Sequence, residues 1–230
     1  MQRAEARQRL DDLVSRYLGA SARAADPQLT PRIRALARFQ AQRLAATYAD
    51  LRQQSRYRAA VDFFLTDLYG PQDLLDRDRQ VLRALDKLKR YLPAAALDAL
   101  AGAFELHVLT IELDTETAGC LLGPAPVDAA GYAEAYRHAG RRSDRDRQIQ
   151  LIGLIGALLD GLARHPEVGL AIRLARAPAH AAGYGQLQDF LERGYAAFRA
   201  LDGAAEFLAI VDQRERRLMQ RMFAGSSELA

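Results

Sequence analysis

The 230-residue sequence has almost no cysteine, since Cys120 is the only one. A single cysteine excludes an intramolecular disulfide framework and is typical of a protein from a reducing compartment. The N-terminal stretch is charged throughout and has no apolar run of signal-peptide length. The longest apolar stretch, residues 149–162, is interrupted by Gln150, Asp160 and three glycines, so it is too short and too polar to cross a bilayer. We therefore expect a cytoplasmic protein.

Lysine is also scarce, because Lys87 and Lys89 are the only lysines among 32 basic residues. This skew toward arginine is typical of a GC-rich genome rather than of a function. The net charge of +3 is small, and the 29 acidic residues are interleaved with the basic ones. Because no long tail of one sign exists, the sequence does not indicate a nucleic-acid or membrane partner.

Strand-like alternation of apolar and polar residues is absent at any useful length, whereas apolar residues recur at helical spacing almost everywhere. The sequence therefore predicts an all-α protein. No long Pro-, Gly- or Ser-rich linker and no internal repeat divides the chain. We expect a single multi-helix, bundle-like domain of about nine helices over residues 1–230, with a subdivision near residue 124 as the alternative.

Several local signals predict helix boundaries. Gly19 is expected to end the first helix, and Thr30-Pro31 to begin a long helix that reaches Gln54, with its arginines and glutamines facing water. Asp128 predicts an N-cap for residues 129–140, and Ser143 with Asp146 resembles a capping box. Pro166 predicts the start of a short helix that ends before residue 178. Gly153 and Gly156 would permit a close approach to a second helix.

The stretch FFLTDLYGP, residues 63–71, is predicted to be core rather than a site. Helical spacing places Tyr57, Val61, Phe64 and Leu68 on one face, so Phe64 and Leu68 are expected to be largely buried. Asp67 lies at the border of this face and is expected to pair with an arginine or a backbone amide. Gly70-Pro71 predicts the end of the helix.

Four segments of the chain resemble an uncharacterised all-helical family from proteobacteria whose members carry a segment similar to FFLEELYGP. The segments are FFLTDLYGPQDLLDRD, YAEAYRHAGRRSDRDRQIQLI, LQDFLERGYAAFRAL and FLAIVDQRERRLMQRMF. The chain departs from the pattern at Thr66-Asp67, where the family has two glutamates. The resemblance implies a helical fold and no established activity.

Motifs for metal binding and catalysis are weak. His107 lies near Glu105, Glu112 and Asp114, but a di-metal site of the ferritin type needs Glu-x-x-His on each of two helices. A hydrogen-bonded core histidine is the favoured interpretation, so we predict no metal and no cofactor. Cys120 has no basic partner nearby in sequence and is expected to be a small apolar filler. Because no nucleophile–base pair is visible, the sequence favours a protein that is not an enzyme.

An arginine cluster provides the candidate ligand site. It lies where one helix ends at Gly140 and the next begins at Ser143, and guanidinium groups beside a helix N-terminus favour an anion. Two tyrosines, one turn apart, could line the same cleft. The candidate residues are Arg137, Arg141, Arg142, Arg145, Tyr132 and Tyr136. Solvated ion pairs with Asp144 and Asp146 are the alternative explanation.

Two functions follow from these patterns. The favoured prediction is a non-enzymatic cytosolic helical module that binds another protein or self-associates, since apolar stripes are plentiful and catalytic spacing is absent. The alternative is a protein that binds a small anionic ligand through the arginine cluster.

Overall fold

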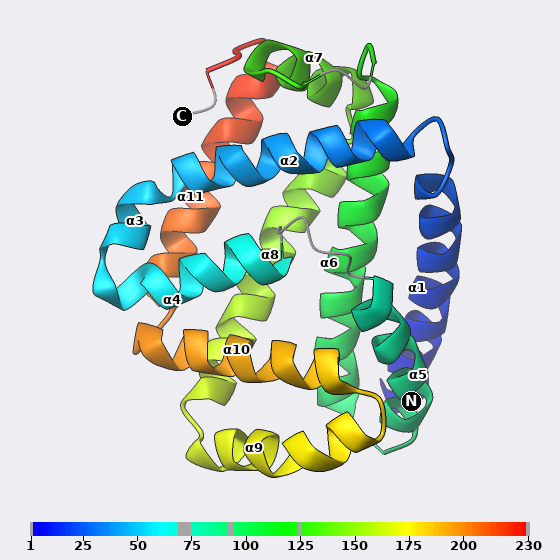
Figure 1. The fold of residues 1–230 in the computed structure, drawn as a ribbon, viewed down its shortest axis with the longest axis vertical. Coiled ribbons are helices and arrows are strands. Elements are labelled where there is room, and N and C mark those ends of the chain that lie inside the picture. Colours follow the sequence, from blue (N-terminus) through cyan, green and yellow to red (C-terminus); the bar gives the residue numbers. More distant parts are fainter. Residues whose placement is uncertain (1, 69–74, 92–93, 124–125, 229–230) are drawn as a thin grey trace.

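The structure, a computed structural model, describes residues 2–68, 75–91, 94–123 and 126–228. Every regular element in these ranges is a helix, which confirms the all-α prediction (Figure 1). The elements are α1 (Gln2–Ala24), α2 (Thr30–Thr47), α3 (Ala49–Gln53), α4 (Ser55–Phe63), the π-helical turn η1 (Phe64–Leu68), α5 (Leu75–Tyr91), α6 (Ala94–Gly119), α7 (Ala129–Ala139), α8 (Arg142–Ala163), α9 (Pro166–Ala181), α10 (Gly185–Leu201) and α11 (Ala205–Phe223).

The long helices α6 and α8 lie side by side at the centre of the fold (Figure 1). Helix α1 packs along α6, and α11 packs along α8. Helices α2, α4 and α10 cross these long helices on one face, with α7 at one end of the molecule and α9 at the other (Figure 1). Side chains from α2, α6, α8 and α11 therefore meet in the interior.

The described residues form eleven α-helices, more than the nine or so predicted. One reason is that the expected helix from residue 30 to residue 54 breaks at Tyr48, whose φ of −112° and ψ of 15° are not helical. Helix α1 runs through Gly19 to Ala24, and α9 continues past Pro178, so both predicted ends are wrong. Asp128 is confirmed as an N-cap, because its side chain accepts a hydrogen bond from the Gly131 amide. Residues 124–125, at the predicted subdivision, lie outside the described residues.

Two apolar clusters frame the interior. The Phe207 cluster joins α4, α10 and α11, and the Tyr132 cluster joins α2, α7 and the C-terminal half of α11. The Phe207 cluster contains Leu44, Tyr48, Leu51, Tyr57, Ala60, Val61, Phe198, Leu201, Phe207 and Val211, with Phe64, Leu65 and Ile152 packed against it. The Tyr132 cluster contains Leu36, Tyr132, Ala133, Tyr136, Ile149, Leu218, Met219 and Met222.

The predicted core stretch of residues 63–71 is buried in a different register from the one expected. Phe63 is buried against Phe190, whereas Phe64 is only partly buried and packs against Phe207. Phe63 is the last residue of α4, and the π-helical turn η1 begins at Phe64, so side chains from Phe64 onward depart from α-helical spacing. Asp67 is buried and accepts hydrogen bonds from Arg193 Nε and Nη2 at 2.9 and 2.6 Å, as predicted. The Leu68 side chain and the Gly70-Pro71 end lie outside what the structure describes.

Gly156 allows the close contact between α8 and α11, whereas Gly153 does not. A Cβ atom on Gly156 would overlap the buried Leu208 side chain, but one on Gly153 would meet nothing within 4 Å. We expect Gly156→Ala to lower the free energy of unfolding by about 1–2 kcal/mol, because overpacking outweighs the gain in helix propensity. Gly153→Ala should raise it by up to about 1 kcal/mol. Urea unfolding checks both, and equal effects would contradict this packing.

Candidate functional site

The six residues predicted to form the anion site divide into two groups. Arg137, Arg141 and Arg142 lie toward the surface, whereas Arg145, Tyr132 and Tyr136 are buried. Arg137 Nη1 lies 3.5 Å from the Met222 carbonyl oxygen, and the exposed Arg142 guanidinium lies 5.5 Å from the Phe223 ring centroid. The structure therefore does not bring all six side chains into one cleft.

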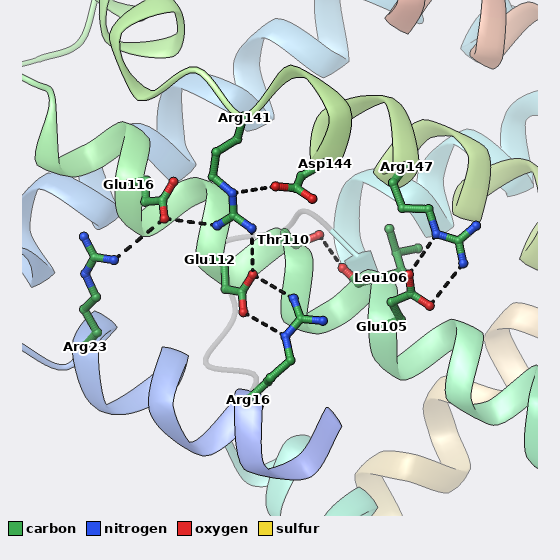
Figure 2. Close-up of polar contacts among 10 residues, drawn as sticks. All are labelled: Arg16, Arg23, Glu105, Leu106, Thr110, Glu112, Glu116, Arg141, Asp144 and Arg147. Atoms are coloured by element: carbon green, nitrogen blue, oxygen red, sulfur yellow. Dashed lines mark hydrogen bonds and ion pairs between the residues drawn. The ribbon is translucent and has the colours of Figure 1, made fainter. Parts of the chain in front are cut away.

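Arg141 is held by carboxylates from two helices (Figure 2). Its Nη2 donates to Glu112 at 3.2 Å, its Nη1 to Glu116 at 3.0 Å and its Nε to Asp144 at 2.7 Å. Burial alone would lower the pKa of Arg141, but the hydrogen bonds that it donates to Asp144 and Glu112 raise the pKa above its usual value. The guanidinium is therefore charged and occupied by three carboxylates.

The same side of α6 forms further ion pairs with α1 and α8 (Figure 2). Glu112 also accepts a hydrogen bond from Arg16 of α1 at 2.9 Å, and Glu105 accepts one from Arg147 of α8 at 2.8 Å. The Arg147 hydrogen bond is the main cause that lowers the pKa of Glu105. These contacts tie α1, α6 and α8 together, so we assign this part of the arginine cluster to helix packing.

Arg141 has left-handed backbone angles, with φ 54° and ψ 42°. A side chain in this region costs about 1–2 kcal/mol, a cost that glycine does not have. We expect Arg141→Gly to be more stable than Arg141→Ala by about 1 kcal/mol, since both lose the same ion pairs. The order should reverse at Arg147, inside α8, where alanine is better than glycine by about 1 kcal/mol. Thermal unfolding of the four variants checks this, and the same order at both positions would contradict it.

Arg145, Tyr132 and Tyr136 do meet, in an interior cavity. Its volume is about 80 Å³, several times the roughly 10–15 Å³ that one enclosed water needs. The cavity lies where α2, α6, α7, α8 and α11 converge, and Phe64 and Leu65 of η1 also line it. π-Helical turns are frequent at functional sites. The polar lining residues are Gln40, Arg43, Tyr48, Thr110, Asp114, Tyr132, Tyr136, Arg145, Gln148 and Glu215.

Arg145 is a buried cation, with only 5% of its surface exposed. Its Nε donates to the Gly140 carbonyl at 3.0 Å, and its Nη2 to the Thr117 hydroxyl at 2.9 Å. Its guanidinium carbon lies 3.4 Å from the centre of the Tyr136 ring, a cation–π contact. Among the described residues, no carboxylate forms an ion pair with Arg145. Its guanidinium group instead contacts neutral groups: a carbonyl, a hydroxyl and an aromatic ring.

Arg43 is the second cation of the cavity, and its side chain is 10% exposed. Its Nη1 donates to both carboxylate oxygens of Glu215, at 2.8 and 3.0 Å, and the Tyr48 hydroxyl donates to the same carboxylate at 2.8 Å. Burial alone would lower the pKa of Arg43, but the charge of Glu215 raises it, so the guanidinium stays protonated. Its buried Nε–H has no hydrogen-bond partner in the described part of the chain.

Asp114 is the second carboxylate of the cavity. Its Oδ1 accepts a hydrogen bond from Gln40 Nε2 at 2.8 Å. Burial raises the pKa of Asp114, against the opposing effects of Gln40, Arg145 and Arg43. Burial also raises the pKa values of Tyr132 and Tyr136, so both hydroxyls stay protonated at neutral pH. The cavity thus combines two permanent cations with one carboxylate that protonates more readily than usual.

Seven of the ten polar lining residues were not predicted as site residues: Gln40, Arg43, Tyr48, Thr110, Asp114, Gln148 and Glu215. The expectation that the arginines and glutamines of residues 30–54 face water is wrong for Gln40 and Arg43, which line the interior. The sequence does contain a signal for Arg43 and Glu215, which is their spacing from apolar residues. Arg43 follows Phe39 by four residues, and Glu215 follows Val211 by four. Both therefore lie on the apolar stripe of their helix, where a polar residue faces the core.

The carboxylates near His107 do not gather around it. Glu105 and Glu112 bind arginines, Asp114 lines the cavity, and the His107 ring stacks on Tyr17 with centroids 5.6 Å apart. Within the described residues, no group of three His, Cys, Asp or Glu side chains could hold a metal ion. Cys120 is exposed, so its prediction as an apolar filler is wrong.

The comparisons with known proteins identify a family without an assigned role. A family model described as a domain of unknown function, DUF8198, matches residues 20–229, so the chain belongs to this family. No curated protein and no solved structure matches the chain. Searching the described helices for membrane spans finds none that is both long and apolar enough.

Proposed function

We propose that the protein binds a small anionic molecule in the interior cavity lined by Arg43 and Arg145. The observation that carries the proposal is Arg145, a buried guanidinium that no described carboxylate pairs with. Removing an ion from water costs several kcal/mol, which an opposite charge in good geometry offsets. An anion in the cavity would supply that charge.

Arg43 supports the same proposal independently. Its Nε–H is buried without a described partner, and a buried donor left unsatisfied costs about 1–3 kcal/mol. Within the described residues, Arg43 contacts Glu215 through Nη1, so other guanidinium hydrogens remain available for a bidentate contact. Protonated Tyr132 and Tyr136 would add neutral hydroxyl groups to the lining.

Thermal shift measurements with inorganic phosphate, sulfate, acetate and butyrate test the proposal. At least one anion should raise the melting temperature of the wild type, because a ligand at 100 times its Kd stabilises the native state by about 2.7 kcal/mol. The shift should disappear in Arg145→Met, which keeps an unbranched apolar stem in place of the arginine stem but removes the charged guanidinium group. Arg142→Met is the matched control, since Arg142 lies exposed three residues earlier and should behave as wild type. The proposal would be contradicted if no anion raised the melting temperature of the wild type, or if the same anion raised that of Arg145→Met equally.

The proposal retains the expectation of a cytoplasmic bacterial protein without catalytic activity. Its support is the sequence: one cysteine, no nucleophile–base spacing, and the resemblance to a proteobacterial family. A ligand-binding protein needs a cavity and charges but no reacting group.

Exposed leucines favour self-association as a second candidate function. Leu154, Leu158 and Leu162 are 61%, 41% and 42% exposed and follow one another at intervals of four residues along α8. Ala157 and Gly161 are exposed beside this ridge, and a Cβ on Gly161 would meet nothing within 4 Å. A leucine ridge next to a groove of small residues is self-complementary, because each copy's ridge fits the other's groove around a two-fold axis. The occupant is thus a second copy of this chain.

Light scattering coupled to size-exclusion chromatography tests this second candidate. The wild type is expected to elute as a dimer and Leu158→Asp as a monomer with unchanged helical content. A monomeric wild type at about 100 µM, a concentration well above the Kd of a standard-size interface, would reject it.

A further inference from the structure

Apolar side chains of the Phe207 cluster line one end of the cavity, about one to two helical turns from its charged groups. Arg43, Asp114, Arg145 and Glu215 supply the charges. On α11, Val211 and Phe207 precede Glu215 by one and two turns, which is about 6 and 12 Å at a rise of 1.5 Å per residue. On α8, Ile152 follows Arg145 by seven residues, or about 10 Å. The apolar lining residues that belong to or pack against the Phe207 cluster are Leu44, Val61, Phe64, Leu65, Ile152, Phe207 and Val211. Three more, Ile149, Leu218 and Met222, belong to the Tyr132 cluster, so apolar side chains also border the charged groups.

The charges of the cavity suit one negative charge better than two. Arg43 is paired with Glu215, and Asp114 accepts a hydrogen bond from Gln40. Among the described residues, Arg145 is thus the cation of the lining that has no ion pair. One negative charge would complete that pairing, whereas the second charge of a dianion such as hydrogen phosphate would have no cation left to pair with.

The volume limits the size of the ligand. At about 80 Å³ the cavity is roughly half the size of the 150 Å³ apolar cavity that accepts benzene. A long acyl chain does not fit this space, and an inorganic ion would leave the apolar end uncovered. The polarity, charge and size together describe an amphipathic ligand with a short apolar body.

Resting on the proposed function, we infer that the ligand is a short-chain organic monocarboxylate. Its carboxylate group contacts the guanidinium groups of Arg43 and Arg145, and its alkyl body lies against Ile152, Phe207 and Val211. Contacts at the head supply charge complementarity, and burial of the alkyl body gives about 0.8 kcal/mol for each CH₂ group. Affinity therefore rises with chain length until the apolar end is full, and then falls.

Isothermal titration calorimetry and thermal shift with a graded series of compounds test this inference. The series is acetate, propionate, butyrate, pentanoate and decanoate, with butyramide as the uncharged control and phosphate and sulfate as inorganic anions. We expect a maximum at propionate or butyrate, with a melting temperature raised by about 5–10 °C at 100 times the Kd. Butyramide should bind at least about 10-fold more weakly than butyrate, because it lacks the charge.

Two variants locate the binding. Arg145→Met should abolish binding of every acid. Ile152→Phe fills the apolar end without touching either arginine, so it should weaken butyrate at least about 10-fold while acetate binds as before. This second variant keeps the test available if loss of Arg145 prevents folding.

Each outcome separates the inference from the proposed function. If phosphate or sulfate binds as tightly as butyrate and Arg145→Met abolishes it, the proposed function stands and the carboxylate inference is wrong. If butyramide equals butyrate, or if Ile152→Phe weakens acetate and butyrate equally, the inference is also wrong. If no anion binds, or if binding survives in Arg145→Met, both are wrong.

Discussion

Replacing Glu215 with glutamine is expected to lower the free energy of unfolding by about 3 kcal/mol, because it leaves the buried Arg43 without its opposite charge. Glutamine keeps the shape of the side chain and one carbonyl acceptor for the hydrogen bonds that Arg43 and Tyr48 now donate. The loss is therefore one of charge rather than of packing. Removal of one partner from a buried ion pair typically costs about 3–5 kcal/mol.

Glu206→Gln is the matched control on the same helix. Glu206 also pairs with an arginine, Arg56, at 3.1 Å, but its side chain is 62% exposed, so its loss should cost no more than about 1 kcal/mol. Urea unfolding followed by circular dichroism gives both values. Equal losses would contradict the burial of the Arg43–Glu215 pair. Glu215→Gln should also bind butyrate more tightly than the wild type, because the cavity lining loses a negative charge while both arginines remain.

Phe207→Ala is expected to cost about 3–5 kcal/mol, the range for removing a fully buried aromatic side chain. Phe207 is 2% exposed, and its ring lies 5.9 Å from the centroids of both Tyr57 and Phe64. The substitution also lengthens the apolar end of the cavity. The variant should therefore prefer hexanoate over butyrate, reversing the wild-type order.

Phe198→Ala separates these two effects. Phe198 is 3% exposed and belongs to the same cluster as Phe207, but it does not line the cavity. It should lose a similar free energy of unfolding and keep the wild-type preference for chain length. If both variants change that preference equally, then Phe207 has no special place in the site.

The helical fold follows from the sequence where a local signal fixes the backbone. Asp128 caps α7 because its side chain accepts a hydrogen bond from a free amide of the first turn. Pro166 begins α9 because a first-turn residue needs no N–H for the helix. The break at Tyr48 and the turn η1 have no such signal. Both depend on how distant helices pack, so residues 55–68 show a buried Phe63 where helical spacing predicts Phe64.

The candidate site was predictable only in part, for a related reason. The arginines at positions 137–147 form a cluster in the sequence. Arg141 and Arg147, however, form ion pairs with glutamates of α6, which lie far away in the chain. Only Arg145 turns to the cavity, where it joins Arg43 of α2. The pattern of one helix shows that Arg43 lies on an apolar stripe. It does not show which residues of α6, α8 and α11 surround it.

Isotope-filtered nuclear Overhauser spectroscopy with ¹³C-labelled butyrate shows whether the ligand occupies this cavity, because it reports which protein protons lie within a few ångströms of the ligand. We predict cross-peaks from the butyrate methyl group to the Phe207 ring and to Val211. We also predict cross-peaks from the protons next to the carboxylate to the side chain of Arg43 or Arg145. The assignment of this cavity as the ligand site would be contradicted if saturating butyrate gave no such cross-peaks. It would also be contradicted if the cross-peaks were only to exposed residues such as Leu154 or Leu174.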